Sequence, residues 1–187
     1  MPYTATTTPL SGVLILKPKV FDDSRGFFFE SFNAEEFRCA TGQRVDFVQD
    51  NHSKSAKGVL RGLHYQISHA QGKLVRVTAG EVQDVVVDLR NASPTFGKWL
   101  SVNISAENKK QMWVPPGLAH GFLALSDNAE LLYKTTDYWY PEHERTLLWS
   151  DADLAIAWQL DTIAPHKPQL SVKDSEGVPL ASAETYL

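Results

Sequence analysis

Short runs in which apolar and polar residues alternate recur along most of the chain, separated by turns rich in Gly, Pro, Asn and Asp. A period of two residues is typical of strands with one buried face. Many such runs at short spacing favour a sandwich or barrel over a parallel sheet with crossover helices. The pattern predicts strands over residues 10–16, 27–32, 45–51, 59–67, 73–79, 82–89, 99–104, 111–114, 121–125 and 130–136.

One segment has a helical signature instead. Asn33 is followed three residues later by Glu36, which is a variant of the capping box. Gly42 stands where a C-terminal cap is expected. These signals predict a short helix that runs through Arg38 and ends near Gly42. The polar segment 52–57 is expected to be a loop, and residues 22–26 a turn.

Length and composition describe an ordinary globular protein. The 187 residues are interpreted as a single domain, with a tail from about residue 150 that packs on the body through residues 154–158 and ends in a short helix. The net charge of -4, without a basic stripe, argues against nucleic-acid binding but leaves room for a positive pocket that takes an anionic small molecule. No apolar run is long enough to span a membrane. The N-terminus lacks a signal-peptide pattern, so a cytoplasmic protein is expected. Cys39 is the single cysteine, which excludes a disulfide within the chain.

Imidazole and basic side chains interrupt the apolar stretch around residues 58–73. Arg61 and His64 lie inside a predicted strand, and Lys73 opens the next one. A charged group in a half-buried strand must be paired, because leaving water unpaired is unfavourable. The stretch is therefore interpreted as one wall of a binding site. The alternative, about as well supported by these residues alone, is a core histidine with two basic side chains that reach solvent.

Strict alternation would place Arg61 and His64 on opposite faces of their strand. Gly62 lies between them, and glycine inside a strand often marks a bulge. A bulge at Gly62 would turn both side chains to the same face, and this is predicted.

Residues 115–120 form a Pro-x-Gly-x-x-His turn before an apolar strand, which is similar to the second half of the cupin signature. In metal-binding cupins, the first half is His-x-His followed by Glu. Here His64 is followed by Gln66 at the second histidine position, and by Lys73, whose ammonium has no lone pair for a cation. His120 is therefore interpreted as a residue of a site without a metal, the alternative being a histidine that only caps a turn.

Aromatic residues and the tail add further candidates. Alternation puts Tyr133 on one face of its strand, either as a hydroxyl directed into a cavity or as a core tyrosine with a satisfied hydroxyl. Tyr138 and Trp139 follow where a ring could stack on a nucleobase or pack at an interface. Lys173 and Asp174 lie far along the chain, and Asp174 would matter only if the tail folds back to His64.

Collinear segments that cover nearly the whole chain to about residue 158 resemble the dTDP-4-dehydrorhamnose 3,5-epimerase family. The matching segments are 23–30, 47–53, 58–66, 71–76, 93–97, 116–122 and 133–136, with a further match over 170–174. The resemblance implies an all-β fold, a cupin-type jelly-roll β-sandwich or barrel with short peripheral helices. It also implies a homodimer, and neither metal nor cofactor. The implied activity is 3,5-epimerisation of dTDP-4-dehydro-6-deoxy-D-glucose to dTDP-4-dehydro-L-rhamnose, in dTDP-L-rhamnose biosynthesis.

The same resemblance implies residue roles. His64 is the implied general base and Asp174 the carboxylate that orients it, while Tyr133 is the implied general acid and Lys73 stabilises the enolate. The implied substrate contacts are Arg61 and His120 at the diphosphate and sugar, and Arg25, Glu30, Gln49, Asn51, Glu144 and Lys173 at the thymidine end. Tyr138 and Trp139 are kept as candidate ring contacts because of their place after the strand. Trp139 departs from the family pattern, in which many members have tyrosine. A stacking role would survive that change, whereas a role for the hydroxyl would not.

The residues suit this chemistry. The C3 and C5 protons of the sugar are both alpha to the C4 ketone, so removal of either gives an enolate on the same oxygen, and no oxidation is required. Three alternatives remain open. The first is an epimerase that acts only at C3 or C5 of a related dTDP-4-keto-6-deoxysugar. The second is a cupin that binds a sugar nucleotide without catalysis, and the third is a metal-dependent cupin, which Gln66 and Lys73 disfavour.

Overall fold

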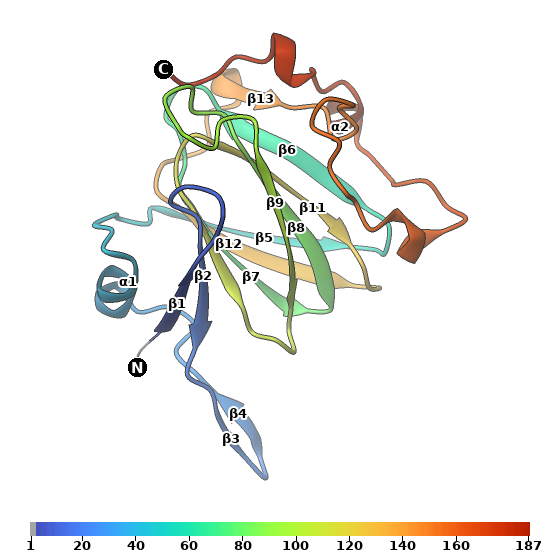
Figure 1. The fold of residues 1–187 in the computed structure, drawn as a ribbon. Helices are drawn as coiled ribbons and strands as arrows, with labels where there is room; N and C mark the ends of the chain where they lie inside the picture. Colours follow the sequence, from blue (N-terminus) through green and yellow to red (C-terminus); the bar gives the residue numbers. More distant parts are fainter. Residues whose placement is uncertain (1–2) are drawn as a thin grey trace.

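Two antiparallel sheets face each other in a computed structural model that describes residues 3–187 (Figure 1). The six-stranded sheet has the order β1-β2-β10-β7-β12-β5, and the five-stranded sheet the order β13-β6-β11-β8-β9. A separate hairpin pairs β3 with β4. The strands are β1 (Tyr3–Thr7), β2 (Leu14–Pro18), β3 (Phe21–Asp23), β4 (Gly26–Phe28), β5 (Gln49–Ser55), β6 (Leu60–Gln66), β7 (Lys73–Ala79), β8 (Glu81–Asp88), β9 (Trp99–Ser105), β10 (Gln111–Val114), β11 (Leu118–Ala124), β12 (Ala129–Thr135) and β13 (Glu144–Thr146). The helices are α1 (Ala34–Thr41) and α2 (Val172–Ser175), with 3₁₀ turns at Pro141–His143, Leu160–Ile163 and Leu180–Ser182.

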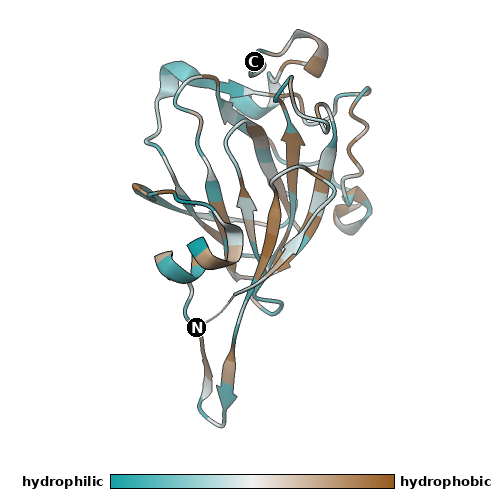
Figure 2. Cartoon of the chain, turned by 60° about the vertical axis from the view of Figure 1, so that its left-hand side comes forward, coloured by the Kyte–Doolittle hydropathy of each residue, from teal (hydrophilic) through white to brown (hydrophobic). Residues whose placement is uncertain are grey.

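The main core lies between the two sheets. Val75 and Met112 point inward from the six-stranded sheet, and Val86 and Ile104 from the five-stranded sheet, and all four are fully buried. In Figure 2, hydrophobic residues concentrate on the strands at the centre of the molecule. Removal of this apolar surface from water stabilises the sandwich by about 25 cal/mol for each Å² buried. The predicted all-β sandwich is confirmed.

The outer faces of both sheets are partly covered. Helix α1 packs Phe37 against Trp113 on the six-stranded sheet, with the ring centroids 5.3 Å apart. Its predicted caps are confirmed. The Asn33 side chain accepts hydrogen bonds from the N–H groups of two first-turn residues, and Gly42 adopts a left-handed conformation at the C-terminus. No helix in the part of the chain that the structure describes has the length and apolar character needed to cross a membrane.

The C-terminal tail packs on the five-stranded sheet. Leu154 is buried there, and Ile156 and Trp158 pack against the same cluster. In Figure 1 the tail, coloured orange to red, runs along one side of this sheet. The last residues contain only a 3₁₀ turn at Leu180–Ser182 rather than a regular helix.

The predicted boundaries of β5 were wrong for a physical reason. The sequence pattern ended this strand at Asn51 and placed a loop over residues 52–57, but the strand continues to Ser55 and pairs with β12 throughout. Polar residues occupy both of its faces. Asn51 and Ser53 line an interior cavity while His52 and Lys54 are exposed to solvent, so no apolar alternation marks the strand.

Other strand predictions also differ. The run 27–32 is not one long strand, because only Gly26–Phe28 is paired, in the hairpin with β3. The rings of Phe21, Phe27 and Phe28 are exposed there, and the hairpin projects from the body (Figure 1). The strand predicted over 10–16 begins only at Leu14. Strands β1 and β13 were not predicted, since each is short and pairs at the edge of a sheet.

The predicted bulge at Gly62 is confirmed. The pairing of β6 with β11 shifts register between His120 and Phe122, so that Arg61 and His64 oppose residues only two apart. Gly62 has a φ of 102°, a region that L-residues rarely adopt. A Cβ atom at this position would lie 2.6 Å from the carbonyl oxygen of His120, so only glycine fits. As a result, the side chains of Arg61 and His64 line the same cavity.

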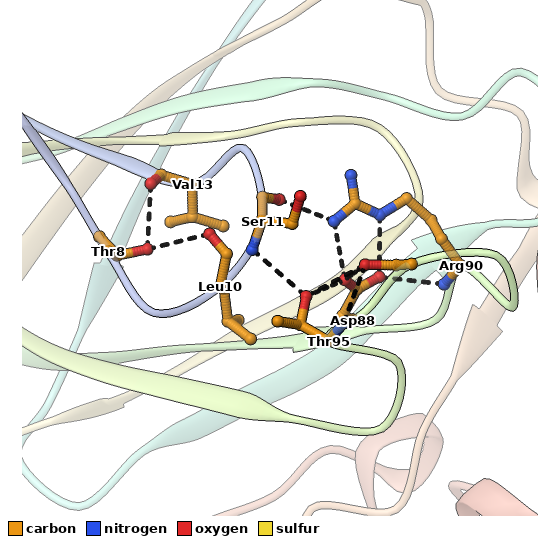
Figure 3. A network of polar contacts seen from close by, with 8 residues as sticks. Thr8, Leu10, Ser11, Val13, Asp88, Arg90 and Thr95 are labelled. Carbon is orange, nitrogen blue, oxygen red and sulfur yellow. Dashed lines mark hydrogen bonds and ion pairs between the residues drawn. The ribbon is translucent and has the colours of Figure 1, made fainter.

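A buried ion pair fixes the loop after β8 (Figure 3). The fully buried Asp88 carboxylate accepts hydrogen bonds from Nε and Nη2 of Arg90 at 2.8 and 2.7 Å. It also accepts the hydroxyls of Ser93 and Thr95 at 2.6 and 2.7 Å. Arg90 Nη2 donates in addition to the carbonyl of Ser11 at 2.7 Å, which ties this loop to the turn before β2. Burial alone would raise the pKa of Asp88, but these donors hold it at about 2.

Replacement of Asp88 by asparagine is expected to lower the free energy of unfolding by about 1–3 kcal/mol at pH 7, because the hydrogen bonds from Arg90, Ser93 and Thr95 lose a charged acceptor. Since the pKa of Asp88 is lower in the folded protein, its stabilisation is present above pH 3.8 and is lost as the pH falls through about 2. Urea unfolding at pH 7 and pH 3 measures both effects. The control is Asp23→Asn, which removes the same Asp-x-Arg pair on the exposed hairpin. Equal stability losses in the two variants would contradict the role of burial.

Candidate active site

A cavity of about 440 Å³ lies between the two sheets. Strands β5, β7 and β12 of the six-stranded sheet supply one wall, and β6 and β11 of the five-stranded sheet supply the other. The segment around α2 and the loop after β12 complete it. The lining residues are Gln49, Asn51, Ser53, Arg61, His64, Gln71, Lys73, His120, Gly121, Phe122, Leu131, Tyr133, Trp139, Glu144, Ser171, Lys173 and Asp174.

His64 and Asp174 form a close pair at this cavity. Nε2 of His64 lies 2.7 Å from Oδ1 of Asp174, a contact that becomes an ion pair only when the ring is protonated. The same Oδ1 accepts the Gly62 N–H at 3.0 Å, and Oδ2 accepts the Ser171 hydroxyl at 2.6 Å. Burial alone would raise the pKa of Asp174, but the His64 ring and these donors hold it well below its usual range. The carboxylate therefore stays charged and fixes the ring, which leaves Nδ1 as the atom that can accept a proton from a ligand.

The tail reaches His64 because its backbone is attached to β6. Gln169 donates its N–H to the Gly58 carbonyl at 2.8 Å and accepts the Leu60 N–H at 3.0 Å. The hydroxyl of Ser171 then caps α2 by accepting the Asp174 N–H at 3.2 Å. Asp174 is thereby directed at the bulge in β6, although it lies more than a hundred residues further along the chain.

Lys73 and Tyr133 occupy the facing sheet, on the neighbouring strands β7 and β12. Lys73 is nearly fully buried, and within residues 3–187 its ammonium has no hydrogen bond or ion pair. Desolvation lowers the pKa of Lys73 to about 8. Its Nζ lies 6.0 Å from the centroid of the Tyr133 ring. Desolvation also raises the pKa of Tyr133, so the phenol keeps its proton at neutral pH.

Two further cations line the five-stranded wall or its rim. Arg61 donates from Nε to the Ser55 hydroxyl at 3.0 Å, which holds its guanidinium beside the cavity. Lys173 pairs with Glu144 at 2.9 Å. Burial would raise the pKa of Glu144, but the neighbouring Lys173 holds it below its usual value. These charges suit a ligand that carries negative charge outside its reacting centre.

The loop after β12 forms one end of the cavity. Gln49 accepts the backbone N–H of Trp139 at 3.1 Å and donates to the Asn51 side chain at 3.0 Å. The Trp139 ring stays half-exposed, with an exposed fraction of 54%, and it lines the cavity. An exposed ring beside amide groups can stack on a flat heterocycle and bind its polar edge.

The whole arrangement can move protons on opposite sides of a ligand. An imidazole lies on one sheet beside a carboxylate from the tail, and a neutral phenol and an ammonium lie on the other sheet. A carbon acid bound between them could lose a proton to one wall and regain one from the other, while the ammonium stabilises negative charge on an oxygen. Among residues 3–187, no group of three or more His, Cys, Asp or Glu side chains is arranged to hold a metal ion.

Comparison with known proteins identifies the family. The family model described as dTDP-4-dehydrorhamnose 3,5-epimerase matches residues 7–182. The chain belongs to the dTDP-4-dehydrorhamnose 3,5-epimerase family. A family member from Pseudomonas aeruginosa is 58% identical over 182 residues, which are 97% of this chain and 98% of the relative.

Solved structures of the epimerase family share the fold. A dTDP-6-deoxy-D-glucose-3,5-epimerase from Legionella pneumophila, in complex with dTDP-4-keto-L-rhamnose, has a TM-score of 0.92 and 48% identity, over 97% of this chain and 95% of that one. A 3′-monoepimerase from Streptomyces bikiniensis, in complex with dTDP-quinovose, has a TM-score of 0.86 and 36% identity, over 94% and 87%. The predicted cupin-type jelly roll is confirmed by these relatives.

The resemblance to the epimerase family implied a set of site residues. Most of these residues line the cavity. Those brought together are His64, Lys73, Tyr133, Asp174, Gln49, Asn51, Arg61, His120, Trp139, Glu144 and Lys173. Arg25, Glu30 and Tyr138 are not among its lining residues. Arg25 lies on the exposed hairpin, where it pairs with Asp23 at 2.6 Å.

The structure adds residues that sequence patterns did not single out for this epimerase-family site. Ser53, Gln71 and Ser171 line the cavity, and the buried Asp84 lies directly behind His120. Ser53 lies in the segment 52–57, which was expected to be a polar loop, and Ser171 lies in the tail. The sequence pattern could have indicated Asp84, because it is a carboxylate next to valines in an apolar strand.

Proposed function

We propose that this chain catalyses the 3,5-epimerisation of dTDP-4-dehydro-6-deoxy-D-glucose to dTDP-4-dehydro-L-rhamnose, without a metal or cofactor, in dTDP-L-rhamnose biosynthesis. The observation that carries the proposal is the placement of His64 on one sheet, with Asp174 of α2 beside it, and of Lys73 and Tyr133 on the other sheet, around one cavity. The names of the family relatives support the substrate.

In this proposal His64 removes the proton at C3 or C5, both of which are alpha to the C4 ketone. The electrons move onto the C4 oxygen to form an enolate, which the Lys73 ammonium stabilises. Tyr133 then delivers a proton to the opposite face of the same carbon, which inverts it. A positioned base or acid contributes roughly 10²- to 10⁴-fold to such a reaction. A fixed cation in a cavity poor in water adds an effect of about the same size.

Substrate contacts follow the charges of the cavity. We assign Arg61 and His120 to the diphosphate and sugar. Gln49, Asn51 and the Trp139 ring suit the thymidine end, as does the Lys173–Glu144 pair. Tyr138, which is exposed beside Trp139, stays a prediction as a further ring contact.

A homodimer would explain why Arg25 and Glu30 lie away from the cavity of their own chain. The hairpin that carries Arg25 exposes three phenylalanine rings and projects from the body (Figure 2). We propose that it docks on a second copy of this chain and carries Arg25 and Glu30 to the nucleotide bound there. Sedimentation equilibrium tests the dimer, and a monomer at micromolar concentration would refute it. The cytoplasmic location also stays a prediction, which cell fractionation tests.

The direct experiment is incubation with dTDP-4-keto-6-deoxyglucose in D₂O, followed by NMR of the sugar. Epimerisation predicts deuterium at both C3 and C5, and the L-rhamno product. A protein that only binds the sugar nucleotide would leave both positions protonated. Metal analysis of the purified protein tests the absence of a metal independently.

Replacement of Tyr133 by phenylalanine is expected to separate exchange from inversion. His64 can still remove a proton and return a deuteron to the same face, so exchange continues while net inversion falls by about 10²-fold or more. NMR of the D₂O reaction measures both quantities on one sample. Loss of exchange and inversion in equal proportion would instead make Tyr133 necessary for proton removal.

One observation favours a second candidate. The similarity to a 3′-monoepimerase, at 36% identity over 94% of this chain, shows that this fold also serves a single-site enzyme. Deuterium at C3 alone, with no inversion at C5, would establish that activity for this chain.

A further inference from the structure

Asp84 has no role in the mechanism above, yet it lies directly behind the cavity. It belongs to β8, its side chain is fully buried, and it does not line the cavity itself. Within residues 3–187, its carboxylate has one side-chain hydrogen-bond partner, His120. A buried carboxylate with so few partners is unfavourable for folding, which calls for an explanation in function.

The pair is not needed to hold its strands together. Strands β8 and β11 already pair along seven residues, from Leu118 opposite Asp88 to Ala124 opposite Val82. Asp84 and His120 are diagonal neighbours in this register, and their side chains face the interior between the sheets. Replacement of such a polar pair by apolar residues is often neutral or stabilising. A purely structural role is therefore weakly supported.

The contact fixes which nitrogen of His120 faces the ligand. Nε2 lies 2.9 Å from Oδ1 and 3.0 Å from Oδ2 of Asp84. A carboxylate only accepts hydrogen bonds, so Nε2 carries the proton. Nδ1 has no hydrogen bond to any described residue, and the ring lines the cavity. Nδ1 is thus the atom available to the substrate.

The charge of Asp84 also acts on Lys73 across the cavity. Burial destabilises the Lys73 ammonium, while the charges of Glu144 and Asp84 favour it and that of Lys173 opposes it. Glu144 is already paired with Lys173 at 2.9 Å, whereas Asp84 faces only an imidazole. The other titratable groups around Lys73 in the cavity are Arg61, His64, Tyr133 and Asp174.

We propose that Asp84 is a positioning residue of this site: it holds His120 with Nδ1 toward the sugar nucleotide. Its negative charge, buried behind the same cavity, also favours the ammonium form of Lys73. The proposal rests on the proposed function. It adds a residue that acts only through two others and touches no substrate.

The test compares Asp84→Asn with the wild-type protein, first without substrate. NMR of ¹³C-labelled lysine follows the titration of Lys73, whose midpoint in the wild type is expected at about 8. Loss of one nearby negative charge is expected to lower that midpoint by about one unit. In ¹⁵N spectra of the wild type, the ring of His120 is expected to carry a proton on Nε2. This second measurement needs no variant, so it decides the His120 contact even if Asp84→Asn fails to fold.

The kinetic arm measures kcat against pH. If Lys73 loses its proton at a lower pH in Asp84→Asn, the kcat of the variant falls further below that of the wild type as the pH rises. The variant's kcat, divided by the wild-type kcat, is then about tenfold smaller at pH 9 than at pH 6. A structural defect would not produce this pH dependence. Asp50→Asn is the control, because it neutralises an exposed aspartate on β5 that does not line the cavity, and it is expected to leave the Lys73 midpoint unchanged.

The outcomes are distinct. An unshifted Lys73 midpoint in Asp84→Asn, or a wild-type His120 with its proton on Nδ1 alone, overturns the proposal. A wild-type protein without exchange at C3 and C5 overturns the proposed function instead, and the NMR measurements still decide the part played by Asp84.

Discussion

Replacement of His64 by asparagine is expected to reduce deuterium exchange at C3 and C5 by roughly 10²- to 10⁴-fold, the contribution of a positioned general base. The asparagine amide can still contact Asp174 but cannot take a proton. Asp174 keeps its hydrogen bonds from Gly62 and Ser171, so its charge stays satisfied. The fold is therefore expected to persist, with a loss of about 1–3 kcal/mol in the free energy of unfolding.

Three measurements separate chemistry from binding in this variant. NMR gives the exchange rates, calorimetry gives the affinity for dTDP, and urea unfolding gives the stability. Only the exchange rates are expected to change greatly. His166→Asn is the matched control, because His166 is exposed on the tail and does not line the cavity. Exchange in His64→Asn within threefold of the wild-type rate would exclude His64 as the base.

Replacement of Lys73 by methionine is expected to have opposite effects on activity and stability. Methionine fills a similar volume without a charge, so the enolate loses its cation and kcat falls by roughly 10²- to 10³-fold. The buried ammonium, however, destabilises the folded protein. Desolvation lowers its pKa from 10.5 to about 8, which corresponds to about 3 kcal/mol at pH 7. Lys73→Met is therefore expected to be more stable than the wild type by up to about 3 kcal/mol.

The pH dependence gives the sign of this effect. Between pH 8 and 10.5 the unfolded chain still binds the Lys73 proton while the folded protein has released it, so the stability of the wild type rises with pH in this window. The advantage of Lys73→Met is complete below pH 8 and disappears by about pH 10.5. Urea unfolding at pH 7, 9 and 10.5 measures the trend.

Lys134→Met is the matched control for this experiment. Lys134 follows Tyr133 on β12, points to the outer face and pairs with Asp50 at 2.9 Å. Its replacement is expected to leave kcat unchanged and to lower the stability slightly, by less than about 1 kcal/mol. A loss of stability in Lys73→Met would mean that nearby carboxylates compensate the buried ammonium fully.

Local patterns were sufficient where neighbours in the chain decide the structure. Asn33 and Gly42 predicted both ends of α1, because each cap bonds to residues within one turn. Gly62 predicted the bulge, because two polar side chains around one glycine can share a face only there. The turn before His120 and the basic residues of 58–73 indicated a site, because charges inside apolar strands need partners.

The same reasoning failed where a distant segment changes the environment. β5 has no apolar face, because its inner residues Asn51 and Ser53 line a polar cavity rather than the core. A rule based on alternation therefore ended the strand too early. Strands β1 and β13 exist because an edge of a sheet accepts them, and nothing within their few residues signals that edge.

The sequence by itself determined the residue types of the site, the positions of the main strands along the chain, the ends of α1 and the bulge at Gly62. These features depend on contacts over a few residues. Only the tertiary structure decided that Asp174 contacts His64, that burial desolvates the Lys73 ammonium, and that Asp84 lies behind His120. These facts depend on which strands become neighbours and on what the tail covers. Burial and electrostatic coupling arise between segments far apart in the chain, so no local pattern can encode them.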